Sequence, residues 1–297
     1  MSDMREAALL VNIKSRKGDA WFNSAEMILK QKGLHLTTSL RCKKENQLSF
    51  EVQKAISAGV PLIIVGGGDG TLSSVVKLFI GSKSTLGVLP FGTGNSFARD
   101  LGIASNVEAA CEVIVHGKAQ LVDVGRVGSD YFLNVVTVGL TTQIALQLNH
   151  EVKKVWGVLA YLYALIKALA VIKPFEVHLS LPEGEYTFLT LQVVIGNGRF
   201  AGPFPIAPDA SIVDGKLIIY VLIGTTKWDL LRFALNLPGG HQVDLDCVPV
   251  FWTSEGAIST SHPMRVTIDG ESNHYTPLHF GIEKAALKVV VPLEFMI

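Results

Sequence analysis

The first 120 residues alternate between short apolar runs and stretches with helical periodicity. Three runs, AALLVNI (7–13), PLIIV (61–65) and TLGVLP (85–90), are apolar almost throughout, as is typical of strands buried in a parallel sheet. HLTTSL (35–40) is a fourth candidate strand, and helical stretches lie at about 19–32, 46–58, 71–80 and, as two short pieces, within 95–116. This alternation predicts a doubly wound, Rossmann-like α/β domain over residues 1–122, which binds its ligand at the carboxyl ends of the strands.

After about residue 122 strands predominate, and helices intervene only around 140–172 and 226–236. The candidate strands are YFLNVVTV, FEVHLSL, YTFLTLQVVI, KLIIYVLI, PMRVTI and ALKVVVPL. Strands separated by turns predict a mainly antiparallel, β-rich second domain over residues 123–297, which would bind the substrate. We expect LVDVGRVGSD (121–130) to be the crossing point, the last strand to return to the first domain, and the active site to lie between the domains.

Composition limits the class of protein. The 297 residues suffice for two domains, and a mean hydropathy of +0.37 suggests large cores or a face that meets lipid. Lys+Arg and Asp+Glu both total 26, so net charge argues neither for nor against a polyanionic partner. We expect no nucleic acid partner. The cysteines, Cys42, Cys111 and Cys247, are odd in number and lack CxxC spacing. This argues against a disulfide framework and a zinc site and favours the cytoplasm.

The longest apolar run is VWGVLAYLYALI (155–166), continued after Lys167 by ALAVI. It is shorter than the roughly 20 residues of a membrane-spanning helix, so we expect no transmembrane span. One interpretation is a buried helix. The other is a helix over 155–172 that rests on a membrane, with Trp156, Tyr161 and Tyr163 near the interface, giving peripheral contact with the inner face.

A glycine-rich turn follows the second of the apolar runs, in PLIIVGGGDGTLSSVV (61–76). Glycines allow backbone N–H groups to approach an anion closely, and the start of the next helix adds its positive end. The Walker pattern is absent because no lysine follows Gly70, and GxGxxG fails because Thr71 replaces the third glycine. Asp69 inside the turn suits a metal, its water shell or a proton. The alternative is a tight turn in which Asp69 caps a helix.

Two further turns after strands carry polar side chains. PFGTGNSFARDLGI (90–103) places hydroxyl and amide groups beside glycines, with Arg99 in the following helix. Turns after adjacent parallel strands would converge on one nucleotide. VNIKSRKG, after the first strand, adds basic and polar side chains that could reach phosphates, or that are simply solvated.

Together these turns resemble the diacylglycerol kinase catalytic-domain family, particularly its soluble bacterial lipid kinases. The superfamily also contains sphingosine kinases, NAD kinases and phosphofructokinases, which share GGDGT, but NAD kinases lack the GTGNSFAR block in this form. The resemblance covers nearly the whole chain, because VDVGRV (122–127) and FLNVVTVG (132–139) are similar to the family's crossover segment, with Asp123 and Asn134 in their usual places.

The resemblance implies an enzyme that uses ATP and Mg²⁺ to phosphorylate a lipid hydroxyl at a membrane surface, most simply diacylglycerol, giving phosphatidic acid. A homodimer is one option for its oligomeric state. The implied nucleotide-binding residues, with Thr37 as an alternative to Thr38, are Asn12, Ser15, Arg16, Lys17, Thr38, Gly66, Gly67, Gly68, Asp69, Gly70, Thr71, Ser74, Gly92, Thr93, Gly94, Asn95 and Ser96.

Two later blocks imply the metal site and the catalytic carboxylates. IGNGRFAGPFPIAPDASIVDGKL (195–217) is similar to a magnesium-site block, in which Asp214 would give its side chain and Ser211 and Lys216 their carbonyls. IDGES (268–272) resembles the family's DGE motif, and the resemblance implies that Glu271, or alternatively the Asp69/Asp269 pair, accepts the proton of the lipid hydroxyl. The alternatives are a polar turn that caps a strand and a pair of surface carboxylates.

The family pattern breaks in two of the turns. The glycine turn usually continues GGGDGTxNE, and here Ser73 and Ser74 follow; the second turn is usually GTxND, and here Ser96 replaces the aspartate. Serine keeps a hydrogen bond but loses the charge. This leaves open a catalytically weak, kinase-like module that binds nucleotide or lipid, and, with less support, an NAD kinase.

Overall fold

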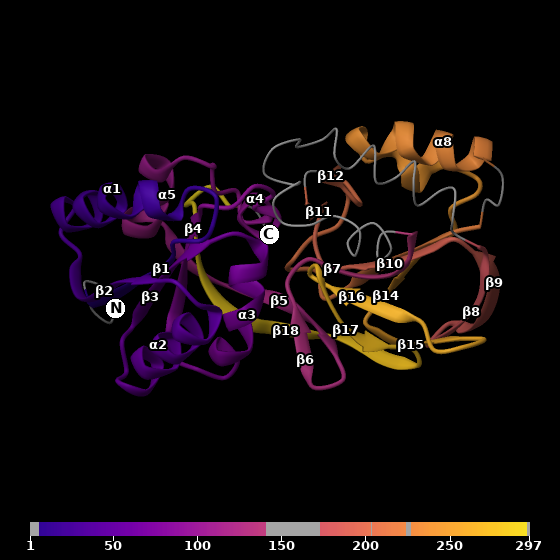
Figure 1. Ribbon diagram of the computed structural model, residues 1–297, viewed down its shortest axis with the longest axis horizontal. Coiled ribbons are helices and arrows are strands. Elements are labelled where there is room, and N and C mark those ends of the chain that lie inside the picture. Colours follow the sequence, from indigo (N-terminus) through magenta and orange to yellow (C-terminus); the bar gives the residue numbers. More distant parts are fainter. Residues whose placement is uncertain (1–5, 141–172, 203, 224–226, 296–297) are drawn as a thin grey trace. The chain divides into compact units, whose positions relative to one another are not determined.

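The structure is a computed structural model that describes residues 6–140, 173–202, 204–223 and 227–295. It divides into two compact units (Figure 1). Unit 1 comprises the chain up to Val124 together with Ile212–Gly215 and the segment from Glu283 onward, and unit 2 comprises Gly125–Ser211 and Lys216–Ile282.

Unit 1 is built on a parallel sheet, as the alternating pattern predicts. Its strands, in sheet order, are β2 (His35–Cys42), β1 (Glu6–Asn12), β3 (Leu62–Gly67), β4 (Thr85–Pro90) and the second half of β18 (Leu278–Val291). The apolar residues 7–11 of β1 and 62–65 of β3 are almost wholly buried because neighbouring strands and helices cover them. β5 (Lys118–Val127) pairs with β18.

Helices lie on both faces of this sheet (Figure 1). On one face α1 (Gly18–Gln31) contacts α5 (Val107–His116), and on the other α2 (Glu45–Ser57) contacts α3 (Asp69–Phe79). α1 shows why: Phe22, Ala25 and Leu29 recur every three to four residues and are buried as one stripe. The short helix α4 (Ser96–Asp100) follows β4. The doubly wound prediction is confirmed.

Unit 2 is mainly antiparallel, as predicted. One sheet has, in order, β14 (Val250–Thr253), β13 (Leu217–Leu222), β10 (Gln192–Gly196), β7 (Val135–Gly139), β16 (Arg265–Ile268) and β17 (Glu271–Tyr275). A second set continues from the first half of β18 through β15 (Glu255–Thr260), β8 (Phe175–Leu181) and β9 (Gly184–Thr190). The smaller strands are β6 (Asp130–Phe132), which pairs with β5, and the pair β11 (Phe200–Ala201) and β12 (Phe204–Pro205).

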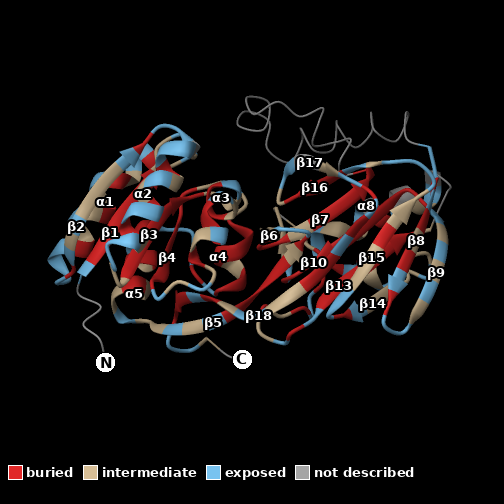
Figure 2. Cartoon of the chain, turned by 90° about the horizontal axis from the view of Figure 1, so that it is seen from below, coloured by how far each residue is buried: buried red, intermediate tan, exposed pale blue. Residues whose placement is uncertain are grey.

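The two sets of strands share one core (Figure 2). β8 alternates, so that Phe175, Val177, Leu179 and Leu181 enter this core while the intervening side chains are not buried. β13 is buried at every position because alternate side chains enter the shared core and a second cluster on the other face of its sheet. Helix α8 (Lys227–Asn236) covers that second cluster, which confirms the helix expected around 226–236.

Two expected strands are each divided in the structure. YFLNVVTV becomes β6 and β7, and YTFLTLQVVI becomes β9 and β10. In both cases the chain leaves one sheet and joins the other, so the hydrogen-bonding partner changes while the apolar pattern continues. The stretch over 250–260, interrupted by Ser254 and Gly256, supplies two strands that the pattern did not predict.

The predicted helices over 140–172 lie outside the described residues, apart from residue 140. Among the residues that the structure describes, no helix is long and apolar enough to cross a membrane.

Candidate active site

The two glycine-rich turns of unit 1 are in direct contact at the carboxyl ends of β3 and β4. A Cβ on Gly68 would lie 3.2 Å from the Cα of Gly92, and a Cβ on Gly92 would approach Gly68 more closely still. The N–H of Phe91 donates to the carbonyl of Gly67 at 2.9 Å. Glycine is therefore required for close approach of the backbones, and the convergence expected of these turns is observed.

Asp69 ties the two turns together. It is the first residue of α3, but its Oδ1 accepts a hydrogen bond from the N–H of Phe97 at 3.2 Å, and the hydroxyl of Ser96 donates to Oδ2 at 3.4 Å. Its carboxylate therefore caps the start of α4. Asp69 is half-buried.

The turn after β1 is hydrogen-bonded to both glycine-rich turns. Asn12 Nδ2 donates to Thr71 Oγ1 at 2.9 Å, and the N–H of Lys17 donates to the carbonyl of Phe91 at 2.9 Å. Ser15 Oγ donates to the carbonyl of Asn12 at 2.6 Å, which closes the turn on itself. Hydrogen bonds thus connect the three turns that follow the neighbouring strands β1, β3 and β4.

Asn95 shapes the second turn from within. It has a left-handed backbone with φ 49°, which asparagine tolerates better than most residues, and only 4% of it is exposed. Its Oδ1 accepts from the N–H of Gly92 at 2.9 Å, and its Nδ2 donates to the carbonyls of Pro90 and Gly92. Its side chain holds the turn, whereas Thr93 and Gly70 are exposed, and Gly94 is half-buried.

The basic residues of the first turn differ in how they are held. The ammonium of Lys17 lies 3.9 Å from the centre of the Trp21 ring, and Trp21 packs edge-on against Phe91 at 5.4 Å. This cation–π contact holds the Lys17 side chain beside the joined turns. Arg16 is exposed.

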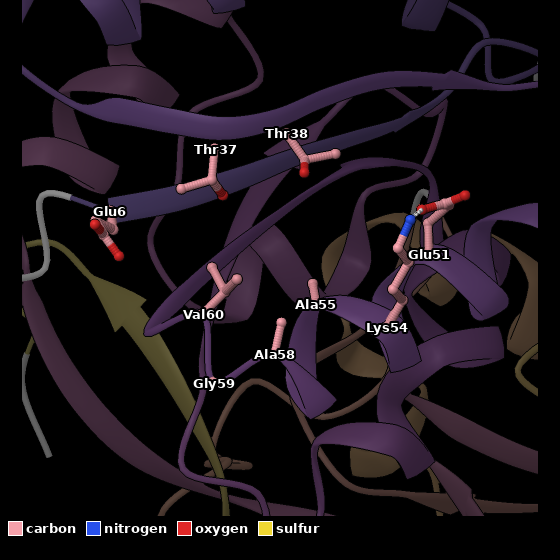
Figure 3. Close-up of a pocket in the computed structure, with 9 residues that line it drawn as sticks. All are labelled: Glu6, Thr37, Thr38, Glu51, Lys54, Ala55, Ala58, Gly59 and Val60. Carbon is pink, nitrogen blue, oxygen red and sulfur yellow. Dashed lines mark ion pairs between the residues drawn. The ribbon is translucent and has the colours of Figure 1, made fainter.

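Thr38 is not brought to the three turns. It pairs with Ala8 of β1, four residues before Asn12, and lines a cavity of about 290 Å³ between β2 and α2. The cavity is toward the amino ends of the strands, and Figure 3 shows Thr37 and Thr38 there with the ion-paired Glu51 and Lys54. The hydroxyl of Thr37 donates to the carbonyl of Ala7.

Asp123 holds the segment that carries the expected metal ligand. It is 4% exposed, and its two oxygens accept from the N–H groups of Gly215 and Ala285, both at 2.7 Å, while its own N–H donates to the carbonyl of Ile212. Asp214, next to Gly215, is exposed. The buried carboxylate therefore fixes the backbone of the 212–215 segment and leaves the Asp214 side chain on the surface.

The other expected ligands flank this segment. Ser211 is half-buried, and Lys216 is exposed. Within the described residues there is no group of three or more histidine, cysteine, aspartate and glutamate side chains that could hold a metal. A site here would therefore depend on one carboxylate and main-chain carbonyls, an oxygen set that suits a hard cation such as Mg²⁺.

Asp269 and Glu271 lie at a tight hairpin between β16 and β17. Asp269 and Gly270 have φ of 46° and 95°, and Ile268 pairs with Glu271 across them, as in a two-residue Asp-Gly hairpin. The Asp269 carboxylate accepts from three successive N–H groups, those of residues 133, 134 and 135, at 2.7 to 3.0 Å. Asp269 is thus a structural carboxylate, while Glu271 is exposed.

The prediction missed one residue beside this hairpin. Asn197, in the quoted stretch IGNGRF, is fully buried; its N–H donates to the carbonyl of Asn134 and its Nδ2 to that of Leu133. Asn134 is 3% exposed, and its side-chain oxygen has no hydrogen-bond partner among the described residues. The position of Asn197 directly after a strand was the only signal in the sequence that could have indicated it. Its contacts with Leu133 and Asn134 join residues about sixty positions apart, which local pattern does not reveal.

Known proteins match both units of the chain. Residues 6–127 match the diacylglycerol kinase catalytic domain, and residues 134–291 match the YegS C-terminal NAD kinase beta sandwich-like domain. A Pseudomonas aeruginosa protein named "Probable lipid kinase YegS-like" is 31% identical over 247 residues, which cover 81% of this chain and 80% of that protein. The chain belongs to the diacylglycerol kinase catalytic-domain family. The resemblance drawn from GGGDGT and GTGNSFAR is confirmed.

Other members of the family agree with this assignment. A Bacillus subtilis protein named diacylglycerol kinase is 29% identical over 240 residues, 78% of each chain. A crystal structure from Bacillus anthracis (strain Sterne) matches with a TM-score of 0.82 and 25% identity over 97% of this chain and 95% of that one. A further structure, of a diacylglycerol kinase from the same strain, has a TM-score of 0.77 at 23% identity over 98% of each chain, which supports the fold. The chain is a lipid kinase in this general sense.

Two serines distinguish this lipid kinase from the pattern of its family. Ser96 is 1% exposed, and its hydroxyl faces the Asp69 carboxylate. Ser74 donates its hydroxyl to the carbonyl of Thr71, within its own helix, at 2.8 Å. Both hydroxyls are therefore hydrogen-bonded within unit 1, at positions where the family pattern has carboxylates.

Proposed function

We propose that this lipid kinase transfers the γ-phosphoryl group of ATP to the hydroxyl of diacylglycerol, giving phosphatidic acid, with Mg²⁺ as the metal. The observation that carries the proposal is the joining of three turns at the ends of β1, β3 and β4 by the Gly68–Gly92 contact and the bonds of Asp69 and Asn12. Glycine turns at helix starts offer backbone N–H groups to phosphates. The name of the Bacillus subtilis relative supports diacylglycerol as the acceptor.

In this proposal the residues of the turns have two kinds of role. Gly66–Thr71 and Gly92–Ser96 provide the main-chain surface for the phosphates, and Arg16 and Lys17 supply positive charge. Asn12, Ser15, Asn95 and Asp69 are positioning residues, because their side chains hydrogen-bond within or between the turns. Ser74 would contribute to nucleotide binding only indirectly, by its hydrogen bond within the first turn of α3. Thr38 lies apart from the three turns and is given no role in this proposal.

The metal would be held by the Asp214 side chain and the carbonyls of Ser211 and Lys216. The all-oxygen donor set fits Mg²⁺, and Asp123 fixes the intervening backbone through its hydrogen bond to Gly215. When bound, the metal supplies charge neutralisation at the transferring phosphoryl group.

Glu271 is proposed as the general base. Its carboxylate accepts the proton of the lipid hydroxyl as the hydroxyl oxygen forms a bond to the γ-phosphorus. The bond from the γ-phosphorus to the β–γ bridging oxygen breaks, and ADP leaves. Asp269 positions the base, because its three hydrogen bonds fix the hairpin from which Glu271 projects.

The test is a pair of matched glutamate substitutions. Glu271→Gln should lower turnover by about 100-fold or more, since positioned bases contribute at least that much, while ATP binding stays measurable by calorimetry. Glu183→Gln changes another exposed glutamate at a hairpin, between β8 and β9, and should leave turnover unchanged. Undiminished phosphorylation by the Glu271→Gln variant would remove the assignment of the base.

A second candidate function is a kinase-like module with little activity that binds nucleotide or lipid. Ser74 and Ser96 favour it, because both replace carboxylates of the family pattern. The double variant Ser74→Glu/Ser96→Asp distinguishes the two. A large gain from a near-zero baseline supports the module, and ready phosphorylation by the unmodified protein supports the kinase.

A further inference from the structure

Helix α8 has one face against the core of unit 2 and another face that is apolar and exposed. Phe233 is 4% exposed and packs on Tyr220 of β13, with ring centres 6.3 Å apart. Trp228 and Leu235 are 66% and 70% exposed, the highest values among the large hydrophobic side chains of the described residues. Figure 1 shows α8 on the outside of unit 2.

The spacing places the exposed residues on one stripe. At 100° per residue, Arg232 and Leu235 lie within about 40° of Trp228 around the helix axis, whereas Phe233 lies about 140° away. Arg232 is exposed as well. Among the residues of α8 whose side chains the structure describes, the outer stripe therefore carries a tryptophan, an arginine and a leucine, on a helix that Phe233 anchors to the sheet.

We propose that this outer stripe of α8, formed by Trp228, Arg232 and Leu235, is a docking surface for the lipid bilayer that contains the substrate. The inference rests on the proposed function, because a kinase acting on diacylglycerol must meet a membrane surface to reach it. Trp228 and Leu235 would enter the boundary between headgroups and acyl chains, and Arg232 would contact anionic headgroups.

The composition of the stripe fits a membrane interface. Tryptophan is enriched there because its ring is apolar and its N–H can be hydrated, and basic residues beside it attract anionic lipids. Arginine can also keep its aliphatic stem on apolar surface while its guanidinium remains in the headgroup layer.

The size of the stripe argues against a stable protein partner. Two partly exposed apolar side chains offer on the order of 300 Å², whereas each partner of a standard protein interface buries about 800 Å². Weak, reversible attachment to a membrane needs less buried area, because a few inserted side chains and a basic residue act together. A bilayer is therefore the occupant that the area and charge of this stripe fit.

The test is co-sedimentation of the full-length chain with vesicles of phosphatidylcholine, alone or with phosphatidylglycerol. Trp228→Ala/Leu235→Ala should lower binding by about tenfold or more, and Arg232→Gln should reduce only the extra binding that phosphatidylglycerol brings. The matched control is Met27→Ala/Phe50→Ala, because these side chains are 54% and 65% exposed on helices of unit 1. The control should bind vesicles as the unmodified chain does.

Further measurements separate this proposal from the proposed function. Circular dichroism and thermal melting first establish that each variant folds. Phosphorylation of a short-chain, water-soluble diacylglycerol should be unchanged in Trp228→Ala/Leu235→Ala, while phosphorylation of long-chain diacylglycerol in vesicles should fall with vesicle binding. If no lipid is phosphorylated, the proposed function fails, and vesicle binding still decides the role of α8.

Two results would overturn the docking proposal. The first is equal vesicle binding by the unmodified chain and by Trp228→Ala/Leu235→Ala. The second is a change of oligomeric state in that variant, measured by sedimentation, because the stripe would then be an interface between copies of this chain.

Discussion

A methyl group at Gly92 would push apart the two turns on which the nucleotide site depends. In Gly92→Ala the new Cβ would lie 2.8 Å from Asn95 Oδ1, 3.2 Å from the backbone N of Gly68, and closer still to the Gly68 Cα. Ordinary van der Waals contacts of a Cβ begin at 3.4 Å, so Asn95 Oδ1 must move by about 0.6 Å and the Gly68 backbone by more than that. Both are held, Asn95 by its bonds to Pro90 and Gly92 and Gly68 by the start of α3.

The expected cost follows from overpacking at a rigid place. Inserting a methyl group into a well-packed region typically destabilises by about 1–3 kcal/mol, and movement of Gly68 also displaces N–H groups that would face the phosphates. We therefore expect Gly92→Ala to lower the free energy of unfolding by about 2 kcal/mol and to weaken ATP binding by at least tenfold.

Gly70→Ala is the matched control for stability. No atom lies within 4 Å of a Cβ at Gly70, which is inside α3, and alanine favours a helix over glycine by up to about 1 kcal/mol. This variant should be as stable as the unmodified chain or more so, while a Cβ on the exposed turn hinders close approach of phosphate. Urea unfolding and calorimetric titration with ATP measure the two effects. The reasoning is refuted if Gly92→Ala matches the unmodified chain in both stability and affinity.

Three other changes give separable results. Asp123→Asn puts an amide where a carboxylate now accepts hydrogen bonds from two N–H groups, and it should lower the free energy of unfolding, measured in urea, by about 2 kcal/mol. The control is Asp130→Asn, at an exposed ion pair, which should lower that free energy by less than about 1 kcal/mol. Ser96→Asp places a second carboxylate beside Asp69, and the two like charges repel each other. We expect a lower melting temperature without Mg²⁺ and its recovery when Mg²⁺ is added, because the cation binds to carboxylates. Equal melting temperatures with and without Mg²⁺ would contradict this. Burial raises the pKa of the Cys111 thiol from 9.0 to about 12, so the protonated form is favoured in the folded state. The contribution of this thiol to stability is therefore present below pH 9 and is lost as the pH rises toward 12. Urea unfolding at several pH values should show a shallower alkaline decline in Cys111→Ala, and an identical decline would count against the raised pKa.

The local sequence pattern was sufficient to predict the parallel sheet of unit 1 and the turns that follow its strands. Runs such as 62–65, apolar throughout, are typical of strands covered on both faces of a parallel sheet, and turns that follow adjacent parallel strands lie at the same edge of the sheet. The residues within each turn were therefore predictable, and the observed Gly68–Gly92 and Asn12–Thr71 contacts follow from adjacent parallel strands.

Long-range contacts were not predictable in the same way. Asp123 accepts from Gly215 and Ala285, 92 and 162 positions away, and Asp269 accepts from residues 133–135, so neither spacing nor periodicity indicates these structural roles. The divided strands β9 and β10 were hidden for a related reason. Apolar residues recur on both sides of Leu191, and the sequence does not mark the point at which the hydrogen-bonding partner changes.

The structure places Thr38 away from the three turns, and the sequence motif alone does not specify the position of a residue along a strand. Its hydroxyl is on the edge strand β2 at the level of Ala8, whereas the turns lie beyond Asn12. Position within a parallel sheet depends on the register between neighbouring strands, which this pattern of short polar residues does not specify.

Phosphorylation of diacylglycerol by the purified chain is the most direct measure of the proposed activity. The purified chain is incubated with radiolabelled ATP, Mg²⁺ and, in separate reactions, diacylglycerol in micelles, sphingosine in micelles, or NAD, and the products are identified by mass. We expect label in phosphatidic acid, strongly reduced by Glu271→Gln and unchanged by Glu183→Gln. Label in NAD phosphate instead, or no labelled lipid from a chain that binds ATP, would contradict it.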